Sequence, residues 1–138
     1  MQMSDKEHYV NCRDLHANLP QVIPYTQGLH MPAAGTSNDD EITGSYTLPG
    51  NAKLGDDFHT YAVEWSAAAI KFYVNGNLYE TQKPAAATGR TWEFDHPFFM
   101  LLNVAVGGQW PGAPDSTTSF PQTMKVDWVR VYKPADGG

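Results

Sequence analysis

The sequence is poor in cysteine and in basic residues, and it has no long apolar run. Cys12 is the single cysteine among 138 residues, so the chain cannot form an internal disulfide and its compartment is undetermined. Nine Lys and Arg against fifteen Asp and Glu give a net charge of -6, which excludes the basic footprint of a nucleic-acid-binding protein. The apolar run 98–102 is far shorter than the ~18 residues of a membrane-spanning helix, and no basic-then-apolar leader precedes the body. The five histidines lie too far apart for a local zinc motif.

What the sequence has in quantity is glycine, proline and aromatic residues, distributed as short strands between turns. Residues 58–65 alternate between an apolar and a polar face, and a second strand over 70–74 leads into Asn75-Gly76, a strong hairpin signal. Further strands are predicted over 28–31, 44–48, 77–81, 91–94 and 124–132. Many short antiparallel strands in a chain of this length predict a single all-β sandwich domain.

The chain is organised around residues 98–114, which read FFMLLNVAVGGQWPGAP. The apolar run has the length of a buried strand, in which Met100 and Leu102 face the core and Asn103 faces the other side among small residues. A Gly-Gly pair ends the strand, and Trp110 is at the tip of the following loop. An amide on a strand followed by an indole on a loop can present groups to a sugar. The alternative is that the loop satisfies Asn103 and that Trp110 caps the core.

Several blocks of the sequence resemble glycoside hydrolase family 16, and most closely its laminarinase branch, which cuts β-1,3-glucans. The blocks are DFHTYAVEW at 57–65, IKFYVNG at 70–76, NVAVGG at 103–108, WPG at 110–112, and FPQTM running into VDWVRVY up to residue 132. The resemblance implies a jelly-roll, concanavalin-like β-sandwich with a glucan cleft across its concave face. It divides the chain into an atypical N-terminal segment (1–27), the C-terminal half of a family 16 domain (28–134) and a tail (135–138).

The signature of the family's catalytic strand is absent. It reads Glu-x-Asp-x-x-Glu or Glu-x-Asp-x-Glu, and its first and last glutamates are the nucleophile and the acid/base. Retaining hydrolysis needs two such carboxyl groups roughly 5–5.5 Å apart. The stretch most similar to this signature is residues 3–7, which has Met3 at the position of the nucleophile. No catalytic residue is therefore assigned, and Glu7 is the only candidate. We interpret the chain as half of the family fold, incomplete and without a nucleophile.

The resemblance assigns substrate binding to three residues and a metal position to a fourth. His30 matches a histidine beside the family's catalytic strand, although a surface histidine is the alternative for this position. Asn103 and Trp110 match cleft residues, with the indole offering its face to a pyranose ring. Asp127 matches an aspartate that holds a structural calcium in many members. Because the other ligands belong to the missing half, we expect no cofactor, and calcium is the alternative.

Half of a sandwich leaves strand edges unpaired, so we predict a homodimer formed through sheet edges or strand exchange. A monomer in which residues 1–27 complete a smaller sandwich is the alternative. The predicted function is weak β-1,3-glucan binding without catalysis by the chain alone. Two alternatives stay open: an active endo-β-1,3(4)-glucanase after assembly with a complementary half, and an inert structural or interaction domain. Family members are typically secreted, and the sequence leaves the localisation of this chain open.

Overall fold

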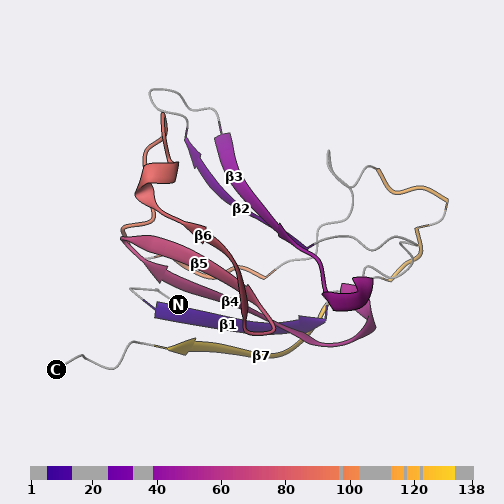
Figure 1. Cartoon of the computed structure of the whole chain (residues 1–138). Helices are drawn as coiled ribbons and strands as arrows, with labels where there is room; N and C mark the ends of the chain where they lie inside the picture. The colour runs from indigo at the N-terminus through magenta and orange to yellow at the C-terminus, as the bar shows by residue number, and fades with distance from the viewer. Residues whose placement is uncertain are drawn as a thin grey trace.

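The computed structural model describes residues 6–13, 25–32, 39–96, 98–102, 113–116, 118–121 and 123–132, and it is all-β (Figure 1). The strands are β1 (Lys6–Arg13), β2 (Tyr25–Pro32), β3 (Asp39–Tyr46), β4 (His59–Ser66), β5 (Ala69–Val74), β6 (Asn77–Gln82) and β7 (Lys125–Tyr132). Three short 3-10 helices accompany them: η1 (Pro49–Asn51), η2 (Leu54–Asp56) and η3 (Pro84–Ala86). Within the described ranges, no helix is long and apolar enough to cross a bilayer.

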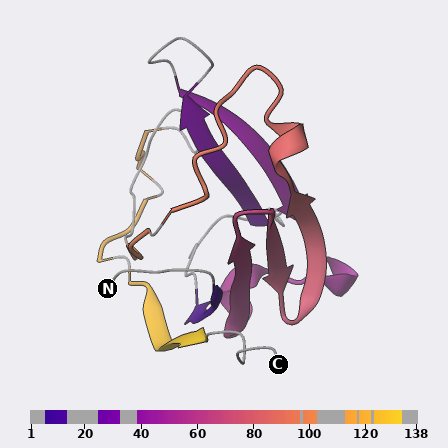
Figure 2. The same ribbon diagram turned by 90° about the vertical axis from the view of Figure 1, so that its left-hand side faces the viewer.

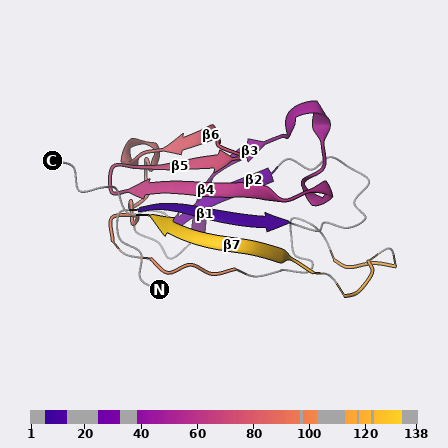
Figure 3. The same ribbon diagram turned by 90° about the horizontal axis from the view of Figure 1, so that it is seen from below.

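The strands form two antiparallel sheets. One has five strands in the order β6-β5-β4-β1-β7, which lie side by side in Figure 3. The other is the β2–β3 hairpin, which rises away from the larger sheet in Figure 2. The two edges of the five-stranded sheet are therefore β6 and β7.

The β5–β6 hairpin forms where the sequence predicts it. Asn75 and Gly76 both have positive φ, at 51° and 77°, which is the backbone of a two-residue type I′ turn. The turn is tied to β4, because the Asn75 backbone N–H donates to the Thr60 carbonyl oxygen at 2.8 Å. The Asn75 side-chain oxygen accepts a bond from the Thr60 backbone N–H at 3.1 Å. Local turn chemistry thus sets the register of three adjacent strands.

β1 is a central strand of the larger sheet, which the sequence patterns did not predict. It pairs with β4 from Lys6↔Trp65 to Cys12↔His59, and it pairs with β7 on its other side. Its sequence, KEHYVNCR, mixes charged, polar and apolar residues without a clear period of two. Part of the N-terminal segment therefore forms an interior strand of the sheet, between β4 and the edge strand β7.

The core lies between the five-stranded sheet and the hairpin. Because opposed residues of an antiparallel pair share a face, the pairs Trp65↔Ile70 and Val63↔Phe72 lie on one face of the larger sheet. We call this the core face, and we call the opposite face, which carries Glu64, the outer face. The buried cluster consists of Leu29, Trp65, Ile70, Phe72 and Ala87.

The stretch 98–102 differs from the buried strand predicted for it. Phe98 and Met100 pack against the core, as the period of two predicts. However, Phe99 is 67% exposed and Leu101 76% exposed, and Leu102 is half-exposed. Residues 99–102 pair with no described strand, and neither do residues 91–94, which were also predicted as a strand. The physical reason is that nothing in the described part of the chain covers the outward side of this segment.

Candidate functional site

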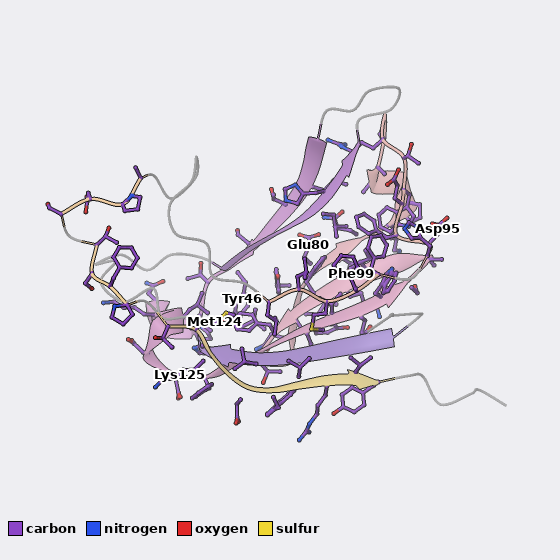
Figure 4. The ribbon with its side chains drawn as sticks, turned by 180° about the vertical axis from the view of Figure 1, so that it is seen from behind. Tyr46, Glu80, Asp95, Phe99, Met124 and Lys125 are labelled. Carbon is purple, nitrogen blue, oxygen red and sulfur yellow. The ribbon has the colours of Figure 1, made fainter. Side chains whose placement is uncertain are left out.

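The hairpin and the segment 90–102 together form a second layer over the core face, and we call this the cover layer. Leu29 and Ile42 of the hairpin pack against the core cluster, as do Phe98 and Met100 of the segment. In Figure 4 the segment that carries Phe99 crosses the sheet on the side of the hairpin. The side of the cover layer that faces away from the core is the candidate site.

His30 belongs to this outward side. Its neighbour Leu29 is buried in the core, whereas His30 itself is exposed, as alternation along β2 requires. His30 is opposed across the hairpin by Glu41. An imidazole in this position is accessible to a ligand lying on the cover layer.

The segment 90–102 is held on the sheet by aromatic contacts. The Trp65 indole N–H donates to the Phe94 carbonyl oxygen at 2.7 Å. The rings of Trp65 and Phe98 meet edge-to-face, with 5.4 Å between their centroids. The His96 ring stacks on the Phe98 ring, with 4.6 Å between their centroids. These contacts fix the backbone that leads toward Asn103. Asn103 and Trp110 themselves lie outside the described residues.

The sequence analysis missed these aromatic anchors, although a signal for them is present. Trp92, Phe94, Phe98 and Met100 occupy even positions of one segment, and all four pack against the core cluster. These positions follow a period of two within 92–94 and again within 98–100, on either side of a turn at 94–96. The large apolar residues at these positions were the signal for the inward side of the segment.

Glu7 lies on β1, in a different sheet from the hairpin that carries His30. The register opposes Glu7 to Glu64 on β4 and to Tyr132 on β7. Glu7 therefore belongs to the outer face, on the other side of the sheet from the cover layer that carries His30. On that outer face Glu64 forms an ion pair with Lys71, with 2.6 Å between the Lys71 Nζ and a Glu64 oxygen.

The sequence model of Glycosyl hydrolases family 16 matches residues 25–130. The chain belongs to glycoside hydrolase family 16. The match spans the hairpin, the meander β4–β6, the segment 90–102 and most of β7.

Individual relatives and structures agree with this family. A β-glucanase from Rhodothermus marinus is 41% identical over 83 residues, covering 56% of this chain and 29% of that protein. The clotting factor G alpha subunit of Tachypleus tridentatus is 41% identical over 81 residues, covering 59% of this chain and 12% of that protein. The structure of the endo-β-1,3-glucanase from Pyrococcus furiosus has a TM-score of 0.80 and 30% identity, over 96% of this chain and 63% of that chain.

The shares of length show that the chain is part of a family 16 jelly roll. It spans less than half of the two relatives and 63% of the Pyrococcus chain, yet nearly all of it superposes on that structure. The expected β-sandwich is confirmed, and so is its partial extent.

Three of the described glutamates, Glu64, Glu80 and Glu93, do not form the family's catalytic pair. Glu64 is on the outer face, whereas Glu80 on β6 is opposed to Phe72 and so lies on the core face. Glu80 (labelled in Figure 4) accepts a bond from the amide nitrogen of Gln82 at 2.9 Å. Glu93 is exposed on the outward side of the cover layer. Because these three carboxylates lie on different faces, no two of them can flank one glycosidic bond.

Asp127, the predicted metal position, is an exposed residue of β7. In the described ranges, no three His, Cys, Asp or Glu side chains gather closely enough to hold a metal ion. Calcium prefers six to eight oxygen ligands. Among the described residues Asp127 belongs to no cluster of carboxylate or histidine side chains, and the calcium position stays a prediction.

Proposed function

We propose that the chain binds β-1,3-glucan weakly and does not hydrolyse it by itself. The observation that carries this proposal is the family match over 25–130, which includes the blocks with Asn103 and Trp110. Neither form of the two-glutamate signature occurs anywhere in the sequence. The names of the Rhodothermus and Pyrococcus proteins, a β-glucanase and an endo-β-1,3-glucanase, support a β-glucan as the ligand.

Binding without cleavage follows from the chemistry of these residues. An indole face gives apolar contact to a pyranose ring, and an amide can donate to and accept from sugar hydroxyls. Cleavage with retention needs a carboxylate nucleophile and a second carboxyl group across the bond. With only part of the cleft present, we expect a dissociation constant near 1 mM, which is about -4 kcal/mol.

The test uses laminarin in two assays. Migration of the purified chain in a native gel should be retarded by laminarin and unaffected by an equal mass of dextran. The same preparation should release no reducing sugar from laminarin or mixed-linkage glucan. Hydrolysis that survives repurification and disappears in Glu7→Gln would contradict the proposal. Absence of retardation would leave the inert interaction domain as the better description.

A second candidate function is endo-β-1,3(4)-glucanase activity after assembly with a complementary half. The exposed apolar residues Phe99 and Leu101 favour it, because their surface is of the kind that a partner covers. In that assembly the partner would supply the catalytic glutamates.

We also propose that the chain forms a homodimer through the edge of β7 that pairs with no described strand. This edge strand has eight residues without proline or glycine, and it exposes more than a third of the surface of Val126, Val129 and Tyr132. Sedimentation at micromolar concentration should give twice the chain mass, and Val129→Pro should give the monomer mass. A wild-type monomer with a cooperative thermal transition would exclude the dimer.

A further inference from the structure

The turn between β5 and β6 carries a dipeptide with a chemistry of its own. Asn75-Gly76 is the only Asn-Gly pair in the sequence, and both residues are exposed. In such a pair the glycine backbone nitrogen can attack the asparagine Cγ, because glycine has no side chain that blocks the approach. The new N–Cγ bond closes a succinimide ring, the Cγ–Nδ2 bond breaks, and the backbone proton leaves with Nδ2 as ammonia. Water then opens the ring to aspartate or isoaspartate.

The Asn75 carboxamide is held at both ends by β4. The Thr60 backbone N–H donates to the Asn75 Oδ1 at 3.1 Å. Because a backbone N–H can only donate, this bond decides which end of the carboxamide faces Thr60. The other end faces His59, with 2.9 Å between the Asn75 Nδ2 and the His59 Nδ1. We call the bonds of the carboxamide to Thr60 and His59 the side-chain clamp.

The clamp also determines where the ring hydrogen of His59 lies. An amide nitrogen donates and does not accept, so the His59 Nδ1 accepts and carries no hydrogen. The hydrogen is then on Nε2, which is buried and has no hydrogen-bond partner among the described residues. The contact with Asn75 therefore selects the Nε2–H tautomer of His59.

We propose that Asn75 is a deamidation site that the side-chain clamp keeps closed in the folded chain. Succinimide formation needs the carboxamide to turn until Cγ is aligned with the Gly76 nitrogen. That rotation breaks the bonds to Thr60 and His59, so both bonds oppose it. The products alter the turn, because aspartate adds a negative charge and lacks the N–H that donates to His59. Isoaspartate also lengthens the backbone by one carbon, in the turn that sets the register of β4, β5 and β6.

The test follows Asn75 by peptide mapping and mass spectrometry during incubation at neutral pH. Asn75 should deamidate at least about tenfold more slowly in the folded chain than in the chain unfolded in urea. His59→Phe keeps a ring but removes the acceptor, and it should raise the rate in the folded chain about five- to tenfold. Trp65→Phe is the matched control, since it also weakens β4 but leaves the clamp intact, and it should keep the wild-type rate. Asn77, which precedes a leucine, should stay unmodified in the same peptide.

Two results would overturn the inference. One is a wild-type rate that is the same in the folded chain as in urea. The other is a His59→Phe rate equal to that of the wild type or of Trp65→Phe, because the clamp would then not control the reaction. If His59→Phe fails to fold, nitrogen NMR of the wild-type chain decides. The His59 Nδ1 should give the signal of an unprotonated ring nitrogen, and a protonated Nδ1 would contradict the clamp.

Discussion

Within the five-stranded sheet, the core face is buried to different extents at β5 and at β7. Val74 on β5 and Val129 on β7 both belong to the core face by register. Val74 is completely buried, whereas Val129 is 38% exposed. Identical side chains on one face of one sheet thus have different surroundings, because the described core cluster involves β4 and β5 and includes no residue of β7.

The comparison separates what a strand pattern determines from what a second layer determines. Alternation places apolar side chains on the core face of β4, β5 and β7. Burial, and with it the stabilisation of about 25 cal/mol per Å² of apolar surface, depends on the layer that packs against that face. The covered side can therefore hold the fold, while the open side and the outward residues of 98–102 are available to other segments.

The largest expected contrast is between two phenylalanines. Phe72→Ala, in the buried cluster, should lower the free energy of unfolding by about 3–5 kcal/mol. Phe99→Ala removes the same atoms from an exposed site and should change it by less than about 0.5 kcal/mol in the isolated chain. Urea denaturation of both variants measures the difference. Comparable losses would mean that the 98–102 segment is covered in solution.

A smaller effect is expected from loosening the cover layer. Trp65→Phe removes the N–H that donates to the Phe94 carbonyl oxygen, and it should cost about 1–3 kcal/mol of unfolding free energy. Amides of residues 92–102 should also exchange faster, because this bond holds their backbone on the sheet. Trp128→Phe is the control: Trp128 lies on β7 with the Arg130 guanidinium 4.6 Å from its ring, and its loss should cost under about 1 kcal/mol. Equal costs would remove the distinction between the two sides.

The smallest stability effect is expected on the outer face. The side chains of Glu64 and Lys71 are 30% and 42% exposed, so solvent and salt screen their ion pair. Glu64→Gln should change the free energy of unfolding by less than about 1 kcal/mol, and the change should shrink further in 0.5 M NaCl. A larger loss that persists in salt would show that the outer face also contributes to the packed core.

Much of the fold could be predicted from local patterns. The Asn75-Gly76 turn, the alternation of β4 and the final strand β7 all have short-range signals, and the structure contains them. β1 could not be predicted, because its place in the sheet comes from pairing with β4 and β7 rather than from its own sequence. The apolar run 98–102 has the composition of a buried strand, but composition cannot tell whether a neighbouring strand is present to bury it.

The candidate site was predicted less completely than the fold. His30 was assigned to the cleft by the family resemblance alone; the structure places it exposed on β2, and its part in substrate binding stays a prediction. Glu7 was a catalytic candidate because residues 3–7 partly match the family signature. Only the register of β1 places Glu7 on the outer face, across the sheet from His30. Asn103 and Trp110 stay predictions, because they lie outside the described residues.

The central claim is that this part of a family 16 domain still binds β-glucan, and Trp110 tests it most directly. Titration with laminari-oligosaccharides should perturb tryptophan fluorescence with a half-saturation near 1 mM, and Trp110→Ala should abolish the response. As an exposed stacking residue, Trp110 should change the free energy of unfolding by less than about 0.5 kcal/mol on truncation, whereas a buried tryptophan would cost about 3–5 kcal/mol. A strongly destabilised Trp110→Ala variant, together with a wild-type spectrum that oligosaccharides leave unchanged, would assign Trp110 to the core and contradict glucan binding.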